Sequence, residues 1–146
     1  MLNFAIIGCG RISKRHVELL GNNAVKDARL AAVCDIDIER AKAYGEKFKV
    51  PYFSDMHEMM KSVKEIDVVS ILTPSGYHAK HALEIVKYGK HILVEKPMAL
   101  TLDDADAMIK ACDEQGVKLF VVKQNRLNVP VKKLREALDK GRFGKL

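Results

Sequence analysis

Short apolar segments alternate with longer amphipathic ones along most of the chain. Runs rich in β-branched and other apolar residues are followed by stretches in which apolar residues recur every three or four positions, as in helices. This alternation is typical of a parallel sheet whose strands are joined by crossover helices. It predicts strands at 4–7, 30–34, 51–53, 67–72, 91–94 and 118–122.

Helices are expected between these strands, and several have recognisable ends. Asp55 and Thr101 are placed as N-caps, each with an acidic residue three positions later. Gly89 and Gly116 are placed as stop signals, because glycine favours the left-handed conformation that ends many helices. The predicted helices are 11–20, 38–48, 56–63, 77–88, 102–115 and 131–139.

Six strands joined by right-handed crossovers predict an α/β fold, a doubly wound parallel sheet with strand order 3-2-1-4-5-6. We expect residues 1–122 to complete this domain and residues 123–146 to form a loop and one further helix. That helix carries apolar residues that need a surface to bury against. They are Val131, Leu134, Leu138 and Phe143.

Composition indicates one cytoplasmic, globular domain. The chain has 146 residues, of which 48% are hydrophobic and 30% charged. Its apolar runs are far shorter than the roughly 18 residues of a membrane span, and Gly8 and Gly10 interrupt a start that lacks the basic segment of a secretory signal. Cys9, Cys34 and Cys112 form no short C-x-x-C pair, so we expect reduced packing residues rather than disulfides or a zinc site.

The positive charge is concentrated at one end of the chain. Residues 123–146 hold eight basic and two acidic residues, which accounts for the whole net charge of +6. Nucleic-acid binders usually add a reading motif or stacking aromatic residues, and here aromatics are 6% with no tryptophan. We therefore expect a solvated helix face and no nucleic-acid partner.

A glycine-rich motif at 8–13 lies directly between the first strand and its helix. Gly8 permits a tight turn, and Gly10 lets the backbone approach a pyrophosphate at the positive end of the helix. Ser13 replaces the third glycine of the dinucleotide fingerprint. Asp35, 25 residues past Gly10, closes the second strand, where a carboxylate binds ribose hydroxyls and favours NAD over NADP. The alternative is a strand-ending aspartate that caps a turn.

The segment 73–78 follows the fourth strand, so it should border a ligand near the point where the strand order reverses. Thr73 and Pro74 belong to this loop. His78 and His81 lie three apart, but no third ligand accompanies them, so we expect no metal site. His78 is interpreted as a polar contact, either to the dinucleotide or to its own loop.

Two further polar segments follow the fifth and sixth strands. In Glu95-Lys96-Pro97, a cationic nicotinamide ring beside Lys96 would disfavour its protonated form, which suits a general acid and base, and Glu95 could orient it. The four polar residues 123–126 are suited to a nicotinamide amide or an anionic substrate, with Arg126 suited to phosphate or carboxylate. A solvated loop is an equally good interpretation of this second segment.

Together these motifs resemble the nucleotide-binding half of the glucose-fructose oxidoreductase, inositol dehydrogenase and rhizopine catabolism (Gfo/Idh/MocA) family, a Rossmann domain. More narrowly, 120–126 and 141–144 are similar to members that oxidise the C3 hydroxyl of UDP-N-acetylglucosaminuronate in surface lipopolysaccharide biosynthesis. The resemblance runs from about Phe4 to Leu146 and rests on 5–12, Cys34-Asp35, Thr73-Pro74 with His78, and Glu95-Lys96-Pro97-Met98-Ala99.

The resemblance implies NAD as cofactor, a nucleotide sugar or sugar as substrate, and hydride transfer from a sugar carbon to nicotinamide. It implies that Lys96 contacts the reacting hydroxyl and that Asn125 and Arg126 face the substrate. The implied cofactor contacts are Gly8, Gly10, Arg11, Ile12, Asp35, Ile36, Thr73, Pro74, His78, Glu95, Lys96 and Gln124.

In the family, a second α/β domain follows the sixth strand and supplies the substrate pocket and the oligomer interface. The resemblance therefore implies a fragment, an isolated domain or a truncated gene product, that binds NAD with little turnover and would form a homo-oligomer through the second domain. Two alternatives stay open: another sugar or polyol dehydrogenase of the same family, and a non-catalytic regulator that responds to NAD.

Overall fold

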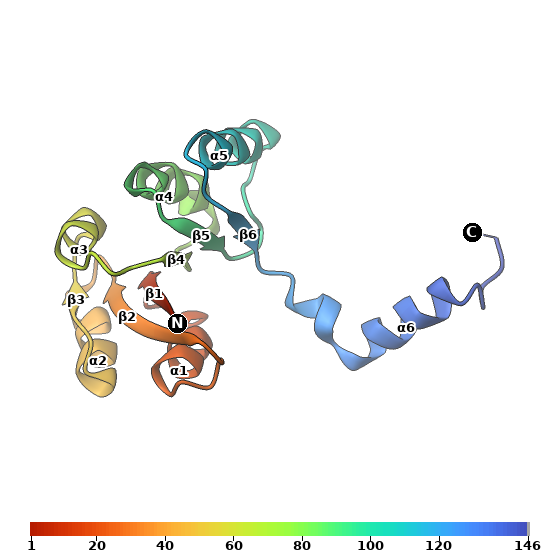
Figure 1. Ribbon diagram of the computed structural model, residues 1–146, viewed down its shortest axis with the longest axis horizontal. Helices are drawn as coiled ribbons and strands as arrows, with labels where there is room; N and C mark the ends of the chain where they lie inside the picture. Colours follow the sequence, from red (N-terminus) through yellow and green to blue (C-terminus); the bar gives the residue numbers. More distant parts are fainter. Residues whose placement is uncertain (146) are drawn as a thin grey trace.

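The computed structural model describes residues 1–145 and confirms the predicted doubly wound sheet. All paired strands are parallel, in the order β3-β2-β1-β4-β5-β6 (Figure 1). The strands are β1 (Leu2–Ile7), β2 (Ala28–Cys34), β3 (Tyr52–Phe53), β4 (Val68–Ile71), β5 (His91–Val94) and β6 (Leu119–Val121).

Helices cover both faces of the sheet. In Figure 1, α1 and α2 lie on one side of the strands and α3, α4 and α5 on the other. The helices are α1 (Ser13–Gly21), α2 (Ile38–Phe48), α3 (Met56–Ser62), α4 (His78–Ile85), α5 (Leu102–Glu114) and α6 (Val129–Asp139), with single-turn 3₁₀ helices η1 (Ser75–Tyr77), η2 (Val86–Tyr88) and η3 (Gln124–Leu127).

The core consists of two apolar layers, one on each face. In β1 the side chains alternate between them, because successive residues of a strand point to opposite faces. Ala5 and Ile7 pack in the layer under α3, α4 and α5, whereas Ile6 packs with Val17 of α1. Burial on both faces explains why the strands read as continuous apolar runs.

Local sequence signals placed most helix ends correctly. The side chains of Asp55 and Thr101 accept hydrogen bonds from backbone N–H groups three residues on, which confirms both N-caps. Gly89 and Gly116 have φ of 66° and 64°, as expected of helix stop residues. The predicted helix 77–88 is divided into η1, α4 and η2.

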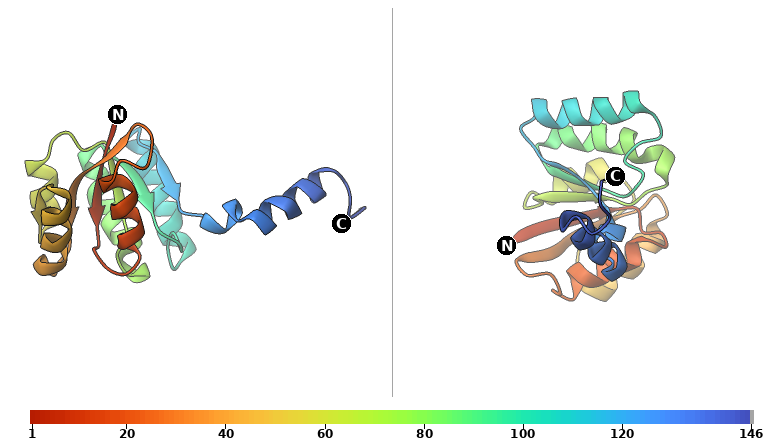
Figure 2. Two further views of the ribbon diagram at one scale, coloured as in Figure 1. Left: turned by 90° about the horizontal axis from the view of Figure 1, so that it is seen from below. Right: turned by 90° about the vertical axis from the view of Figure 1, so that its right-hand side faces the viewer.

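Helix α6 begins earlier than expected and projects from the rest of the fold (Figures 1 and 2). Pro130 lies in its first turn, where a missing N–H costs nothing, so the helix starts at Val129 rather than 131. Its apolar side chains remain exposed, Leu134 by 52%. Within residues 1–145, no helix has the length and apolar sequence needed to cross a membrane.

Candidate dinucleotide site

The residues singled out in the sequence gather at one edge of the sheet. Asp35 follows β2 and Lys96 follows β5, and the carboxyl ends of parallel strands share an edge. β1 and β4 lie between these two strands, so three inter-strand steps of about 4.8 Å separate the strand ends by about 14 Å. The strand order reverses between β1 and β4, which is where ligands bind in such sheets.

The turn after β1 has the geometry that its glycines predicted. Gly8 has φ of +97°, and a Cβ on it would lie 2.8 Å from the backbone of Leu72 and Thr73, so no larger residue fits. Gly10 differs, because a Cβ there would meet nothing within 4 Å. Ser13 is fully buried, and its hydroxyl donates a 2.6 Å hydrogen bond to the carbonyl of Gly10.

The start of α1 has the features of an anion-binding end. No side chain caps it, and the N-cap position is held by Ile12, which is exposed by 45%. Backbone N–H groups at the first turn of a helix otherwise lack partners and favour negative charge. With the open space beside Gly10, these N–H groups fit the pyrophosphate of a dinucleotide.

Asp35 has a structural role that the sequence offered only as an alternative. Its Oδ2 accepts a 2.6 Å hydrogen bond from the backbone N–H of Cys9, and its Oδ1 accepts one of 2.9 Å from that of Asp37. A carboxylate can accept about four hydrogen bonds, so one site on each oxygen remains for ribose hydroxyls. Ile36 beside it is exposed by 94%, which leaves an apolar side chain free to cover an adenine ring.

The loop after β4 is organised by a second histidine. The Oγ1 of Thr73 lies 3.0 Å from Nδ1 of His81, whose ring stacks on Tyr77 with centroids 5.6 Å apart. Burial lowers the pKa of His81, so its ring is neutral at pH 7. Within residues 1–145, no group of three or more His, Cys, Asp or Glu side chains is arranged so that it could hold a metal ion.

His78 contacts its own loop, which is one of the two interpretations that the sequence offered for it. Its ring is 2% exposed, with Nε2 lying 2.7 Å from the carbonyl oxygen of Thr73 and Nδ1 lying 2.7 Å from that of Pro97. Both ring nitrogens are therefore occupied by backbone oxygens rather than free to face a dinucleotide. His78 instead ties the loop after β4 to the loop after β5.

Glu95 contacts the backbone of Lys96 rather than its ammonium group. The carboxylate of Glu95 is buried, and Oε2 accepts a 3.1 Å hydrogen bond from the backbone N–H of Lys96. Its Oε1 lies 3.2 Å from Nε2 of His16, a residue that the sequence interpretation missed. The spacing from Ser13 to His16, one helical turn, was the available signal that both share a face of α1. The peptide bond between Lys96 and Pro97 is cis.

A basic hollow lies at the ends of β5 and β6. It measures about 220 Å³, is lined by Lys96 and residues 122–126, and includes the side chains of Lys123 and Arg126. Within residues 1–145 the Lys96 ammonium has no hydrogen-bond or ion-pair partner, so it is free to meet a ligand. Three cations around one hollow suit an anionic ligand.

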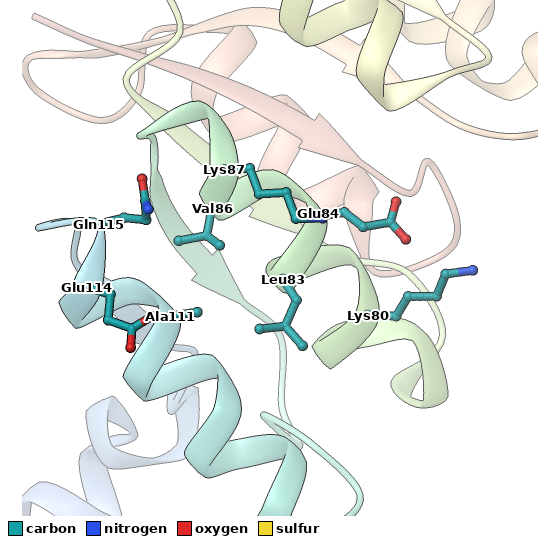
Figure 3. A pocket seen from close by; sticks show the side chains of 8 residues that line it. All are labelled: Lys80, Leu83, Glu84, Val86, Lys87, Ala111, Glu114 and Gln115. Atoms are coloured by element: carbon teal, nitrogen blue, oxygen red, sulfur yellow. The ribbon is translucent and has the colours of Figure 1, made fainter.

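A larger hollow of about 420 Å³ lies between α4 and α5 (Figure 3). Its lining consists of helical side chains such as Leu83 and Ala111, and none comes from the loops that follow the strands. It is a groove between two parallel helices, outside the dinucleotide edge.

The fold and this edge define a class of protein: a dinucleotide-binding domain of the Rossmann type. The profile of an oxidoreductase family with an NAD-binding Rossmann fold matches residues 2–123. The chain therefore belongs to the Gfo/Idh/MocA oxidoreductase family and forms its NAD-binding domain.

Several characterised proteins are similar to this chain. The structure of the WlbA dehydrogenase of Bordetella pertussis was solved in complex with NADH and UDP-GlcNAcA. Its sequence is 39% identical to this chain and its TM-score is 0.92, and the match covers 99% of this chain and 43% of that protein. The myo-inositol 2-dehydrogenase of Thermotoga maritima is 32% identical over 99% of this chain and 42% of its own length. The NADP-dependent scyllo-inositol 2-dehydrogenase IolU of Bacillus subtilis is 33% identical over 96% of this chain and 42% of its own length.

The chain thus spans less than half the length of the relatives it matches. The match covers the coenzyme domain, and the remainder of each relative has no counterpart in these residues.

Proposed function

We propose that this chain is the coenzyme half of an enzyme that oxidises the C3 hydroxyl of UDP-N-acetylglucosaminuronate with NAD, in surface polysaccharide biosynthesis. The observation that carries the proposal is the common edge that Asp35 and Lys96 share, with the uncapped start of α1 between them. A dinucleotide laid along this edge would have its adenosine at Asp35 and its nicotinamide at Lys96.

Each residue has a chemical task in this proposal. The N–H groups around Gly10, Arg11 and Ile12 would bind the pyrophosphate, and the free acceptor sites of Asp35 would bind the adenosine ribose. Thr73 and Pro74, which follow β4 between the ends of β2 and β5, would lie beside the bound dinucleotide. Nicotinamide, when bound, supplies the hydride acceptor.

Lys96 would act on the substrate itself. Its amino group has no hydrogen-bond or ion-pair partner within residues 1–145. With a cationic nicotinamide ring beside it, the neutral amine form of Lys96 would accept the proton of the reacting hydroxyl as the hydride leaves the sugar carbon. Gln124 would contact the nicotinamide amide, while Asn125 and Arg126, in the same basic hollow, would orient an anionic substrate. The carboxylate and diphosphate of a UDP-linked uronic acid match this positive charge.

The choice of substrate is supported by the similarity to WlbA, which was solved with UDP-GlcNAcA and NADH. The test is NADH formation by the full-length gene product with UDP-N-acetylglucosaminuronate, compared with free inositol and glucose. The proposal is supported if the protein oxidises only UDP-N-acetylglucosaminuronate and the Lys96→Met variant loses this activity. Oxidation of inositol but not of the nucleotide sugar would contradict it.

A second candidate is a dehydrogenase that acts on a free polyol or sugar. The similarity to the inositol dehydrogenase of Thermotoga maritima supports it. The two candidates differ in charge, because inositol offers no anion to Arg126. An Arg126→Gln variant would therefore raise the substrate KM about tenfold or more for the charged nucleotide sugar and leave that for inositol within a factor of two.

A further inference from the structure

We propose that His16 is a positioning residue for Lys96, acting through the carboxylate of Glu95. This inference rests on the proposed function of Lys96, but it concerns a residue of α1 that contacts neither coenzyme nor substrate in that proposal.

The direction of the Glu95 side chain follows from β5. Ile92 and Val94 pack in the apolar layer under α4 and α5, so the next residue, Glu95, points to the opposite face. That is the face of α1, and His16 is the side chain of α1 that meets it, with Nε2 3.2 Å from Oε1.

Burial makes this contact necessary. The Glu95 side chain is 7% exposed and that of His16 20%, so neither carboxylate nor ring is freely hydrated. A buried carboxylate needs hydrogen-bond donors on its oxygens, because a buried charge without them is strongly destabilising. Glu95 has two such donors, His16 on one oxygen and the Lys96 N–H on the other. Without His16, the carboxylate would turn towards water and release the Lys96 backbone.

The contact also joins two parts of the site. His16 lies one helical turn beyond Ser13, on the helix whose start is proposed to bind pyrophosphate, and Lys96 lies where the hydride would be transferred. His16 and Glu95 are 79 residues apart in the chain. The pair therefore links the helix at the pyrophosphate end of this edge to the strand end that carries Lys96.

Two variants separate positioning from general packing. His16→Leu removes the donor and keeps an apolar side chain of similar length. His16→Gln keeps a side-chain N–H that reaches Glu95. Lys14→Gln, on the exposed side of the same helix, is the control. In hydrogen-exchange measurements on this chain, the backbone amide hydrogen of Lys96 should exchange about tenfold or more faster in His16→Leu than in the unsubstituted chain. In His16→Gln and Lys14→Gln its exchange rate should stay within about threefold of the unsubstituted value.

The full-length gene product tests the consequence for the reaction. In His16→Leu we expect kcat to fall about 10- to 100-fold while KM for NAD stays within about threefold, because a misplaced group costs rate more than binding. His16→Gln should restore kcat to within about threefold of normal.

Two results would overturn the inference: unchanged amide exchange and kcat in His16→Leu, or equal damage in His16→Leu and His16→Gln. Failure of the proposed function is separate, since it would appear as an absence of turnover in the unsubstituted protein. In that case amide exchange at Lys96 alone decides whether His16 positions this residue.

Discussion

The backbone N–H of Cys9 donates a 2.6 Å hydrogen bond to the carboxylate of Asp35, 26 residues further along the chain. The same carboxylate accepts the backbone N–H of Asp37. Asp35 thus holds the glycine-rich turn and the turn after β2 together before any coenzyme binds. A residue proposed to choose between coenzymes is also a structural part of the pyrophosphate loop.

Replacing Asp35 should therefore affect both stability and binding. In Asp35→Asn, one oxygen becomes an amide NH₂ group that faces a backbone N–H donor. We expect the free energy of unfolding to fall by about 1–3 kcal/mol and the Kd for NAD to rise about tenfold or more. Denaturant unfolding and titration with NAD measure the two effects.

The binding of NAD and NADP to the unsubstituted chain tests the same role of Asp35. A carboxylate beside the ribose repels a 2′-phosphate, so NAD should bind more tightly than NADP. Tighter binding of NADP would contradict the role given to Asp35, and the similarity to an NADP-dependent relative makes this comparison decisive.

His78 should matter for stability because its buried ring bridges two loops. His78→Ala removes the partners of two carbonyl oxygens and leaves a cavity, so we expect a loss of about 2–5 kcal/mol in the free energy of unfolding. His57→Ala is the matched control. His57 also bridges two groups, Tyr88 and Glu84, but its side chain is 37% exposed, so the loss should stay below about 1 kcal/mol. A loss below about 1 kcal/mol in His78→Ala as well would show that the loop contacts of His78 contribute little.

The sequence predicted the fold well because its signals are local. The periods of apolar residues, the caps at Asp55 and Thr101, and the glycines after two helices identify each element from its own residues. Right-handed crossovers then leave few strand orders. The expected start of α6, about residue 131, was two residues late, because Pro130 fits the first turn of a helix and α6 begins at Val129.

The site was predicted as a set of positions but not as a set of contacts. Which residues follow each strand can be seen in the sequence, so Asp35 and Lys96 were expected at one edge. The partners of these residues cannot be seen in the sequence. Cys9 meets Asp35, and His16 of α1 meets Glu95, only when elements far apart in the chain pack together. Strand alternation and helical spacing indicate the faces of Glu95 and His16 separately, but the contact between them depends on how the helix packs on the sheet.

The cysteines beside the site should be chemically silent in the folded chain. Burial, reinforced by the charge of Asp35, raises the pKa of Cys9 to about 12, and burial, reinforced by Asp55, raises that of Cys34 to about 12. Since the thiolate is the reactive form, a disulfide reagent at pH 8 should label both about a hundredfold or more slowly than in the unfolded chain. Labelling as fast as in denaturant would contradict this burial.

The same shifts predict how stability depends on pH. In the unfolded chain these thiols regain their ordinary pKa of 9.0, so the folded chain holds more protons between pH 9 and 12. Their contribution is fully present below pH 9 and is lost as the pH rises through 12. Thermal unfolding of Cys34→Ala should show a weaker decline over this alkaline range than the unsubstituted chain.

Gly8 should not tolerate a side chain. In Gly8→Ala the new methyl group would lie 2.8 Å from backbone atoms of Leu72 and Thr73, at a φ of +97° that other residues rarely adopt. Because backbone cannot yield as a flexible side chain can, we expect a loss of about 2–4 kcal/mol in the free energy of unfolding. A fully stable Gly8→Ala variant would show that the turn can open.

Gly10 differs from Gly8, because a substitution there should weaken NAD binding with little effect on stability. A methyl group on Gly10 would meet nothing within 4 Å, so Gly10→Ala should change the free energy of unfolding by less than about 1 kcal/mol. If that open space receives the pyrophosphate, the methyl group must displace it, and the Kd for NAD should rise about tenfold or more. Denaturant unfolding and titration of the same preparation with NAD give both values. Normal NAD affinity in Gly10→Ala would place the pyrophosphate elsewhere on this edge.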